Sequence, residues 1–290
     1  MSLAERIAGK IQIIDDTPQY SNQLIYGVGG VGKTTYGGTS LNPLIGNAEG
    51  GTIVLKGKRI PAWPVTKFTE LNDVGEFLEE HCVLRDRLRE MIREGATAQQ
   101  LKQIKDALWN LDHLPDNPRG NREPLLFDTF VLDSATDVQT RSLEGVLMEP
   151  KRLEKHDPDK ANLDDYGKTT QQMRKLIRFL KDLPINLVLI CLQLDDKEDS
   201  GEPIVRPHLM PKLCVEVIGM MDCVGYMFTK AVEGNPLQRR LLVQPYGKFR
   251  AKLRRPEGAP QVMTVIEPTW TKVHKLITTM DSIEEIQRGE

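Results

Sequence analysis

Residues Gly27 to Thr34 have the composition and spacing of a phosphate-binding loop. They read GVGGVGKT, which fits G-x-x-x-x-G-K-[ST] at every fixed position. Glycines let the backbone turn so that successive N–H groups point at phosphate oxygens. Lys33 adds a positive charge for the β- and γ-phosphates, and the Thr34 hydroxyl is suited to ligate Mg²⁺. We therefore predict a nucleoside triphosphate site formed by Gly27, Val28, Gly29, Gly30, Val31, Gly32, Lys33, Thr34 and Thr35.

An acidic residue at the end of an apolar run predicts the second half of this site. Residues Phe130 to Ser134 read FVLDS, so Asp133 closes a run that we expect to be a buried strand. A carboxylate there would hold Mg²⁺ through a water molecule, which makes Thr34 and Asp133 the predicted metal-binding residues. The alternative is an ordinary strand-end aspartate that caps the next helix.

Hydrolysis needs a group that orients the attacking water. Glu49 is the predicted catalytic base, because it ends a strand and precedes Gly50-Gly51, a turn that would expose it beside the phosphates. The alternative is a glutamate in a surface turn. Gln193 closes another apolar strand, where its amide could bind the γ-phosphate and signal its loss to the next loop. It could equally well satisfy local backbone groups.

Short apolar, β-branched runs define the elements that must position these residues. The early runs alternate with helical segments, which favours a parallel sheet, whereas the late runs follow one another closely and indicate antiparallel hairpins. The helix after the loop is expected to be brief because Gly37 and Gly38 interrupt it. We predict an α/β fold with a mixed, mainly parallel sheet and strands near Ile11–Ile14, Gln23–Tyr26, Pro43–Asn47, Thr52–Leu55, Phe127–Asp133, Leu187–Gln193, Cys223–Phe228, Arg240–Gln244, Phe249–Leu253 and Val262–Ile266.

One segment differs from its surroundings in composition. Residues 72–113 are rich in Leu, Glu, Arg and Lys, with apolar residues at helical spacing on both sides of Gly95. We expect an inserted helical pair in an otherwise single domain of residues 1–290. The pair could be a solvated hairpin packed on the sheet or a docking element for a partner. Two long polar stretches, Met148–Tyr166 and Asp195–Lys212, are predicted to be mobile loops.

Composition excludes some classes of protein and leaves others open. No apolar run approaches the roughly 20 residues that span a bilayer, and the N-terminus lacks the apolar segment of a secretory signal. Four cysteines without a CxxC pair indicate a reducing compartment. We therefore expect a cytoplasmic protein with no membrane partner. A formal net charge of −2 argues against a generally basic surface, yet a local basic stripe could still bind DNA.

The order of these motifs resembles the RecA-like ATPase core. Within that group the chain is most similar to phage-encoded single-strand annealing proteins of the Sak type. The likeness covers most of the chain outside residues 72–111, and its specific motifs are NAEGGT at Asn47–Thr52, VLDSATD at Val131–Asp137, DYGKTTQQMRKLIRFLKDLP at Asp165–Pro184, EVIGMMDCVGY at Glu216–Tyr226 and AKLRR at Ala251–Arg255.

The resemblance implies a function and a set of partners. It implies ATP with Mg²⁺, Glu49 as the catalytic glutamate, Gln193 as the γ-phosphate sensor, and loops after Ser134 and Gln193 that face DNA. The expected protein is a DNA-stimulated ATPase that binds single-stranded DNA for recombination or annealing, assembles as a filament or ring, and works with a single-strand-binding protein. If the chain is phage-encoded, its compartment is the host cytoplasm. A DnaB-like ring helicase or other DNA motor and a small-molecule kinase or switch-type NTPase are the alternatives.

Four cations alternate with apolar residues near the C-terminus. Lys248, Arg250, Lys252 and Arg254 would share one face of a strand, because side chains alternate with period two. In RecA-like and DnaB-like assemblies a K-x-R pair at this place reaches the neighbouring subunit's γ-phosphate, which makes Lys252 and Arg254 candidate catalytic residues in trans. The alternative is a solvated edge strand protected by charge.

Cations in the two polar stretches and the helix near Thr169–Asp182 are candidate DNA contacts. Such charge runs are usually solvated faces, and sequence-neutral binding of single strands is what they could support. The predicted contacts are Lys151, Arg152, Lys168, Arg174, Lys197 and Arg206.

Overall fold

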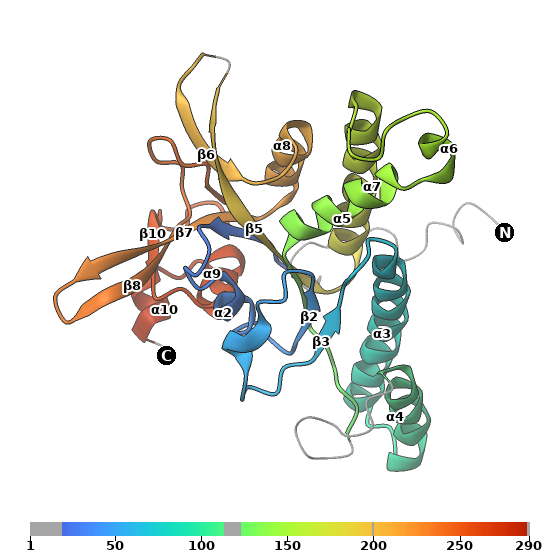
Figure 1. Ribbon diagram of the computed structural model, residues 1–290. Coiled ribbons are helices and arrows are strands. Elements are labelled where there is room, and N and C mark those ends of the chain that lie inside the picture. Colours follow the sequence, from blue (N-terminus) through green and yellow to red (C-terminus); the bar gives the residue numbers. More distant parts are fainter. Residues whose placement is uncertain (1–18, 113–122, 199, 289–290) are drawn as a thin grey trace, which may run out of the picture.

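The computed structural model describes residues 19–112, 123–198 and 200–288 (Figure 1). A central sheet has the strand order β10-β8-β7-β1-β5-β4-β2-β3, with β6 paired to β5 and β9 to β7. The strands are β1 Asn22–Gly27, β2 Pro43–Asn47, β3 Ala62–Pro64, β4 Thr129–Asp133, β5 Asn186–Lys197, β6 Pro203–Pro207, β7 Cys223–Val232, β8 Asn235–Leu242, β9 Lys252–Leu253 and β10 Thr264–Ile266.

Helices cover both faces of this sheet. They are α2 Lys33–Gly37, the short 3₁₀ helix η2 Thr52–Leu55, α3 Glu70–Arg93, α4 Ala98–Asp112, α5 Ala135–Leu147, α6 Pro150–Leu153, α7 Leu163–Asp182, α8 Pro211–Met220, α9 Trp270–Thr278 and α10 Ile283–Arg288.

The middle of the sheet is parallel and its later strands are antiparallel. β7, β1, β5, β4, β2 and β3 pair in parallel, whereas β8 and β10 join antiparallel. The carboxyl ends of the parallel strands meet at one edge, where open α/β sheets place their ligands. β5 lies between β1 and β4, so the strand before the phosphate loop is not adjacent to the strand that ends in Asp133. The predicted α/β fold, with a mixed, mainly parallel sheet and antiparallel C-terminal strands, is confirmed.

The alternation of side chains along the buried strands produces two hydrophobic cores. On one face, Leu24 and Tyr26 of β1 pack with the helices α3, α5, α7 and α8. On the other face, Ile25 packs with α2 and α9 through Tyr36 and Trp270. The sheet is therefore a rigid, doubly covered platform for the groups at its carboxyl edge.

Several predicted elements differ from the observed ones. Residues Thr52–Leu55 form the 3₁₀ helix η2 and not a strand, and only Leu55 is buried while Ile53 is 79% exposed. A run of four residues, of which three are apolar, has too little periodicity to distinguish the two. The predicted strand Phe249–Leu253 is reduced to β9, and β3 and β6 were not predicted. The predicted strand Ile11–Ile14 lies outside the described residues.

The two polar stretches contain more regular structure than expected. Residues 148–166 include α6 and the start of α7, and residues 195–212 include the end of β5, all of β6 and the start of α8. Figure 1 shows β5 continuing past the sheet into a hairpin with β6. Polar composition misled the prediction because a two-stranded hairpin outside the core needs few apolar residues.

The inserted helices α3 and α4, which follow β3 and precede β4 in the chain, pack against each other (Figure 1). Arg85 of α3 is fully buried and donates hydrogen bonds to the carbonyl oxygens of Phe127 (2.7 Å) and Pro184 (2.5 Å). His81 accepts one from the Phe127 N–H at 2.9 Å. These bonds fix α3 to the segments that lead into β4 and β5.

Candidate nucleotide site

The phosphate loop connects β1 to α2 at the carboxyl edge of the sheet. Gly30 and Gly32 have φ angles of 77° and 105°, in the left-handed region that favours glycine. Gly27 packs directly against the carbonyl of Met227, which leaves no room for a side chain. Val31 is buried in the core, while Val28 is 48% exposed. The loop thus has the backbone turns that its glycines predicted.

The helix after the loop is short for a packing reason. α2 spans Lys33–Gly37 and includes Thr35. A methyl group on Gly37 would lie 2.8 Å from a Val131 side-chain carbon, and one on Gly38 would lie 2.5 Å from Leu55. The two glycines therefore allow the end of α2 to contact β4 and η2 closely.

Lys33 is held inside the loop. Its Nζ donates hydrogen bonds to the carbonyl oxygens of Gly27 (3.1 Å) and Val28 (2.7 Å). Burial lowers the pKa of the Lys33 ammonium, an effect that the nearby carboxylates of Glu49 and Asp133 oppose. The ammonium is thus positioned to exchange loop carbonyls for phosphate oxygens.

Thr34 and Asp133 meet at the base of the loop. The Thr34 hydroxyl of α2 donates to Asp133 Oδ2 at 2.6 Å, although β5 lies between β1 and β4 in the sheet. Asp133 is 1% exposed, and burial raises the pKa of its carboxyl group to about 6. Its Oδ1 is buried without a hydrogen-bond partner within the described residues. A hydroxyl beside an unsatisfied carboxylate oxygen fits the oxygen-ligand preference of Mg²⁺.

Glu49 lies next to this pair on an exposed turn. The backbone N–H groups of Ala48 and Glu49 both donate to the Asp133 carbonyl oxygen, at 2.6 and 3.0 Å. Arg141 of α5 donates to the Ala48 carbonyl oxygen at 2.7 Å. The turn is therefore fixed to the strand end that carries Asp133, while the Glu49 carboxylate faces solvent near Lys33.

Gln193 lies on β5, one residue beyond Leu192, which pairs with Gly27. Its Nε2 donates to Asp195 Oδ2 at 3.0 Å, and its Oε1 is buried without a partner in the described part of the chain. The backbone of Gln193 thus lies near the start of the phosphate loop, and its side chain has unused hydrogen-bonding capacity.

Arg239 of β8 also contacts the loop, and sequence reasoning missed it. A methyl group on Gly32 would lie 2.6 Å from Arg239 Nε, so the arginine side chain packs directly on this glycine. Arg239 belongs to the run QRR, which has no motif spacing. Only the pairing of β8 with β7 brings it to the loop.

Lys252 and Arg254 lie at the amino ends of the parallel strands, which we call the amino edge, opposite the carboxyl ends that carry the phosphate loop. Lys252 Nζ donates to the carbonyl oxygens of Ile218 and Gly219, both at 2.9 Å, at the end of α8. Arg254 donates to the Gly219 carbonyl oxygen at 2.8 Å and to Asp222 Oδ1 at 3.0 Å. Both cations stabilise the C-terminal end of α8 in their own subunit, so their predicted role in trans remains a prediction.

The other two cations of this segment bind the β5–β6 hairpin. Lys248 lies 3.7 Å from Asp195, and Arg250 pairs with Glu198. Each of the four cationic side chains in residues 248–254 therefore has an intramolecular partner. The expectation of four charges along one strand was wrong, because only two of the residues in this segment are in β9.

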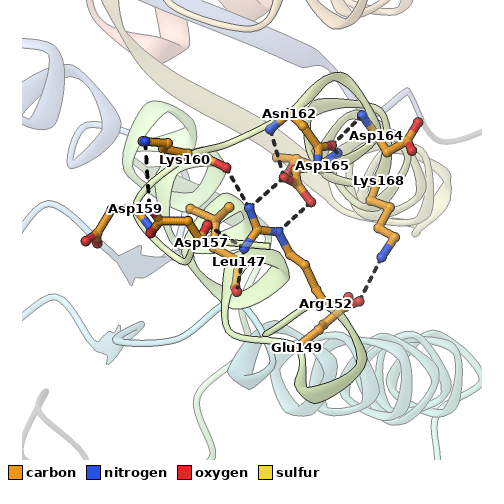
Figure 2. Close-up of polar contacts among 11 residues, drawn as sticks. Leu147, Glu149, Arg152, Asp157, Asp159, Lys160, Asn162, Asp164, Asp165 and Lys168 are labelled. Atoms are coloured by element: carbon orange, nitrogen blue, oxygen red, sulfur yellow. Dashed lines mark hydrogen bonds and ion pairs between the residues drawn. The ribbon is translucent and has the colours of Figure 1, made fainter. Parts of the chain in front are cut away.

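The structure does not support the prediction that Arg152 contacts DNA. Its side chain is 3% exposed and forms a bidentate ion pair with Asp165, with Nε–Oδ1 at 2.8 Å and Nη2–Oδ2 at 3.0 Å (Figure 2). Its other N–H groups donate to the carbonyl oxygens of Leu147, Asp157 and Lys160. Arg152 therefore organises the α6–α7 connection and has no donor left for a phosphate.

The remaining predicted DNA contacts fall into two groups. Lys168, Arg174 and Arg206 form ion pairs with Glu149, Glu216 and Asp196, and the Arg206 side chain is only 11% exposed. Lys151 and Lys197 are exposed, and neither has a carboxylate within 4 Å among the described residues. Lys197 and Arg206 share the β5–β6 hairpin, whereas Lys151 lies on α6 and Lys168 and Arg174 lie on α7.

Comparison with known proteins supports the class of the site. A family model described as an AAA domain matches residues 20–255, so the chain belongs to this family of P-loop ATPase domains. No protein with a curated description matches the sequence. Within the described residues, no helix is both long and apolar enough to cross a membrane.

The solved structures that match this one include two that superpose on it with low TM-scores. The RadB recombinase is 11% identical, with 85% of this chain and 86% of that chain covered and a TM-score of 0.33. The ATPγS-bound monomer of the pCW3 conjugation coupling protein TcpA is 10% identical, with 72% and 49% covered and a TM-score of 0.34.

Proposed function

We propose that this chain is an ATP-hydrolysing, single-stranded DNA-binding protein of the phage Sak type, which acts in strand annealing or recombination as a filament or ring. The observation that carries the proposal is the continuity of β5. The same strand presents Gln193 beside the phosphate loop and extends into the β5–β6 hairpin beyond the sheet (Figure 1). A change at the γ-phosphate can therefore be transmitted to a projecting surface through one strand.

The geometry supports a separate role in hydrolysis for each group of residues at the site. Lys33 and the loop N–H groups would hold the phosphates, and Thr34 with Asp133 would hold Mg²⁺, which supplies charge neutralisation at the transferring phosphoryl group. Glu49 would orient the attacking water from its exposed turn, as a general base does. The bonds from Ala48 and Glu49 to the Asp133 carbonyl oxygen keep the base and the metal-binding carboxylate in register.

DNA binding is proposed for the β5–β6 hairpin and the surface at its base. Lys197 is exposed on the hairpin, and Lys248 lies 5.7 Å from the Phe249 ring centroid. Phe249 stacks on Tyr226 with centroids 4.3 Å apart, and the nearby Tyr246 is 67% exposed. Aromatic faces beside cations suit the bases and phosphates of a single strand. A single-strand-binding protein remains a proposed partner.

Turnover of ATP with and without single-stranded DNA tests the proposal. Wild-type protein should hydrolyse ATP faster with DNA than without it. Lys33→Ala should lose hydrolysis under both conditions. Turnover indifferent to DNA would contradict the coupled model. Unwinding of a forked duplex would favour a ring helicase, and full activity as a monomer without DNA would favour a kinase or switch-type NTPase.

The proposed role of Lys252 and Arg254 in trans has its own test. Lys252→Ala should bind ATP but hydrolyse it slowly under assembling conditions. Mixing it with Lys33→Ala subunits should restore part of the turnover, because the second variant supplies Lys252 to the intact loops of the first. Full turnover of Lys252→Ala alone would show that this lysine only stabilises α8.

A further inference from the structure

Arg239 brings a guanidinium to the phosphate loop from β8. A methyl group built on Gly32 would lie 2.6 Å from Arg239 Nε and 3.3 Å from Cζ. Gly32 immediately precedes Lys33, so the guanidinium lies against the residue next to the phosphate-binding lysine. A hollow of about 190 Å³ separates this part of the loop from the β7–β8 hairpin, and it is lined by Val28 to Val31, Thr229, Leu237 and Arg239.

The backbone of Arg239 is fixed on both sides. Arg239 pairs with Thr229 of β7. On its other side, its N–H donates to Glu267 Oε1 at 3.0 Å, and its carbonyl oxygen accepts from the Glu267 N–H at 2.9 Å. Because side chains of a strand alternate between faces, this pairing directs Arg239 and its neighbour Arg240 to opposite sides of the sheet.

Among the residues that the structure describes, no ion pair neutralises the charge of Arg239. Within the described part of the chain, no carboxylate oxygen lies within 4 Å of its guanidinium. This contrasts with Arg152 and Arg174, whose guanidinium groups are bound to Asp165 and Glu216. An arginine beside a phosphate loop, with donors that no acid occupies, is suited to bind phosphate oxygens.

The strand order indicates which phosphates Arg239 would contact. Glu49, Asp133 and Gln193 lie on β2, β4 and β5 or immediately after them, all on one side of β1. These residues mark the γ-phosphate end of the site, where water would attack. β7 and β8 lie on the other side of β1, so Arg239 approaches the opposite end of the phosphate chain.

We propose that Arg239 binds the α- and β-phosphates of the nucleotide in cis. It is then an affinity residue within the subunit, separate from Lys252 and Arg254, whose proposed action is on the neighbouring subunit's γ-phosphate. This inference rests on the proposed ATP site, and Lys33→Ala tests that site independently.

Calorimetric binding of ADP and ATP to Arg239→Ala tests the inference. Both nucleotides should bind about 10- to 100-fold more weakly than to wild type, which is the effect of losing hydrogen bonds to a charged group. Arg239→Lys should recover part of the affinity, since it keeps the charge without the planar fork. The matched control is Arg240→Ala, whose guanidinium binds Gln238 at 2.7 and 2.9 Å, and its affinities should stay within about twofold.

Three results would overturn the assignment. Unchanged affinity of Arg239→Ala, in protein that melts like wild type, would exclude the contact. A loss confined to ATP would place the contact at the γ-phosphate instead. Equal losses in Arg239→Ala and Arg240→Ala would indicate a structural effect on β8.

Steady-state turnover gives a second readout, in which KM should rise while kcat changes little. Nucleotide binding by Lys33→Ala equal to wild type would instead refute the proposed ATP site itself.

Discussion

The two edges of the parallel sheet use polar side chains in different ways. At the amino edge, Arg85 and Arg254 bind backbone carbonyl oxygens, and Asp222 accepts from the Asn22 N–H and from Arg254. At the carboxyl edge, Asp133 and Gln193 each keep a buried oxygen without a partner in the described structure. Near the amino edge, Asn22 Oδ1 and His81 Nδ1 are also buried without a partner among the described residues, but both side chains already bond the fold through their other polar atom. The unpaired oxygens at the carboxyl edge lie near the phosphate loop, where a ligand can use them, whereas polar groups at the amino edge mainly stabilise the fold.

The largest expected effect tests the chemistry of the carboxyl edge. Glu49→Gln should lower kcat for ATP by about 10²- to 10⁴-fold, because it removes a general base, and leave ATP affinity nearly unchanged. Single-turnover hydrolysis and equilibrium binding measure the two quantities. Glu76→Gln, on the exposed side of α3, is the control. A Glu49→Gln enzyme with wild-type kcat would assign this glutamate to an ordinary surface turn.

At the amino edge, the corresponding change should affect stability and not chemistry. Arg85→Ala should lower the free energy of unfolding by about 3 kcal/mol, because it leaves the carbonyl oxygens of Phe127 and Pro184 buried without a donor. Urea denaturation measures the change. Arg87→Ala, which breaks only the exposed pair with Glu90, should have little effect. Equal effects of the two substitutions would contradict the structural role of Arg85.

A smaller effect is expected from the pH dependence of His81. Burial, aided by the nearby Arg85 guanidinium, lowers the pKa of His81 to about 4. The neutral ring accepts the Phe127 N–H. The unfolded chain binds the proton with a pKa near 6.5, so stability should be fully present above that pH and decline as pH falls toward 4. The loss at pH 5 should be about 2 kcal/mol. His81→Gln should flatten the difference between melts at pH 7 and pH 5, and an unchanged difference would assign the titration elsewhere.

The smallest effect concerns the end of α8. Arg254→Ala should cost about 0.5 kcal/mol, the usual contribution of a cation at a helix C-terminus. ADP affinity of the variant should match wild type, since Arg254 lies at the edge away from the loop. Lys56→Ala, an exposed lysine, is the control for the melt. Weakened ADP binding by Arg254→Ala would erase the distinction between the two edges.

The parts of the site that depend on neighbouring residues could be predicted from the sequence. The phosphate loop is local, because its glycines determine the turns and Lys33 and Thr34 close the same eight-residue motif. Asp133 could be predicted because a buried strand ending in an acid has a clear apolar pattern. The brief α2 was also predicted, although only the structure shows that Gly37 and Gly38 allow contact with Val131 and Leu55.

Only the tertiary structure decided which charged residues have partners. Arg152 is in a polar stretch of sequence, yet it is buried on Asp165, and Lys252 is bound to α8, which is more than 30 residues away in the chain. Arg239 has no motif at all and reaches the loop only because β8 pairs with β7. Local spacing determines backbone turns and strand ends, whereas the partner of a long cationic side chain depends on which distant strand or helix packs beside it.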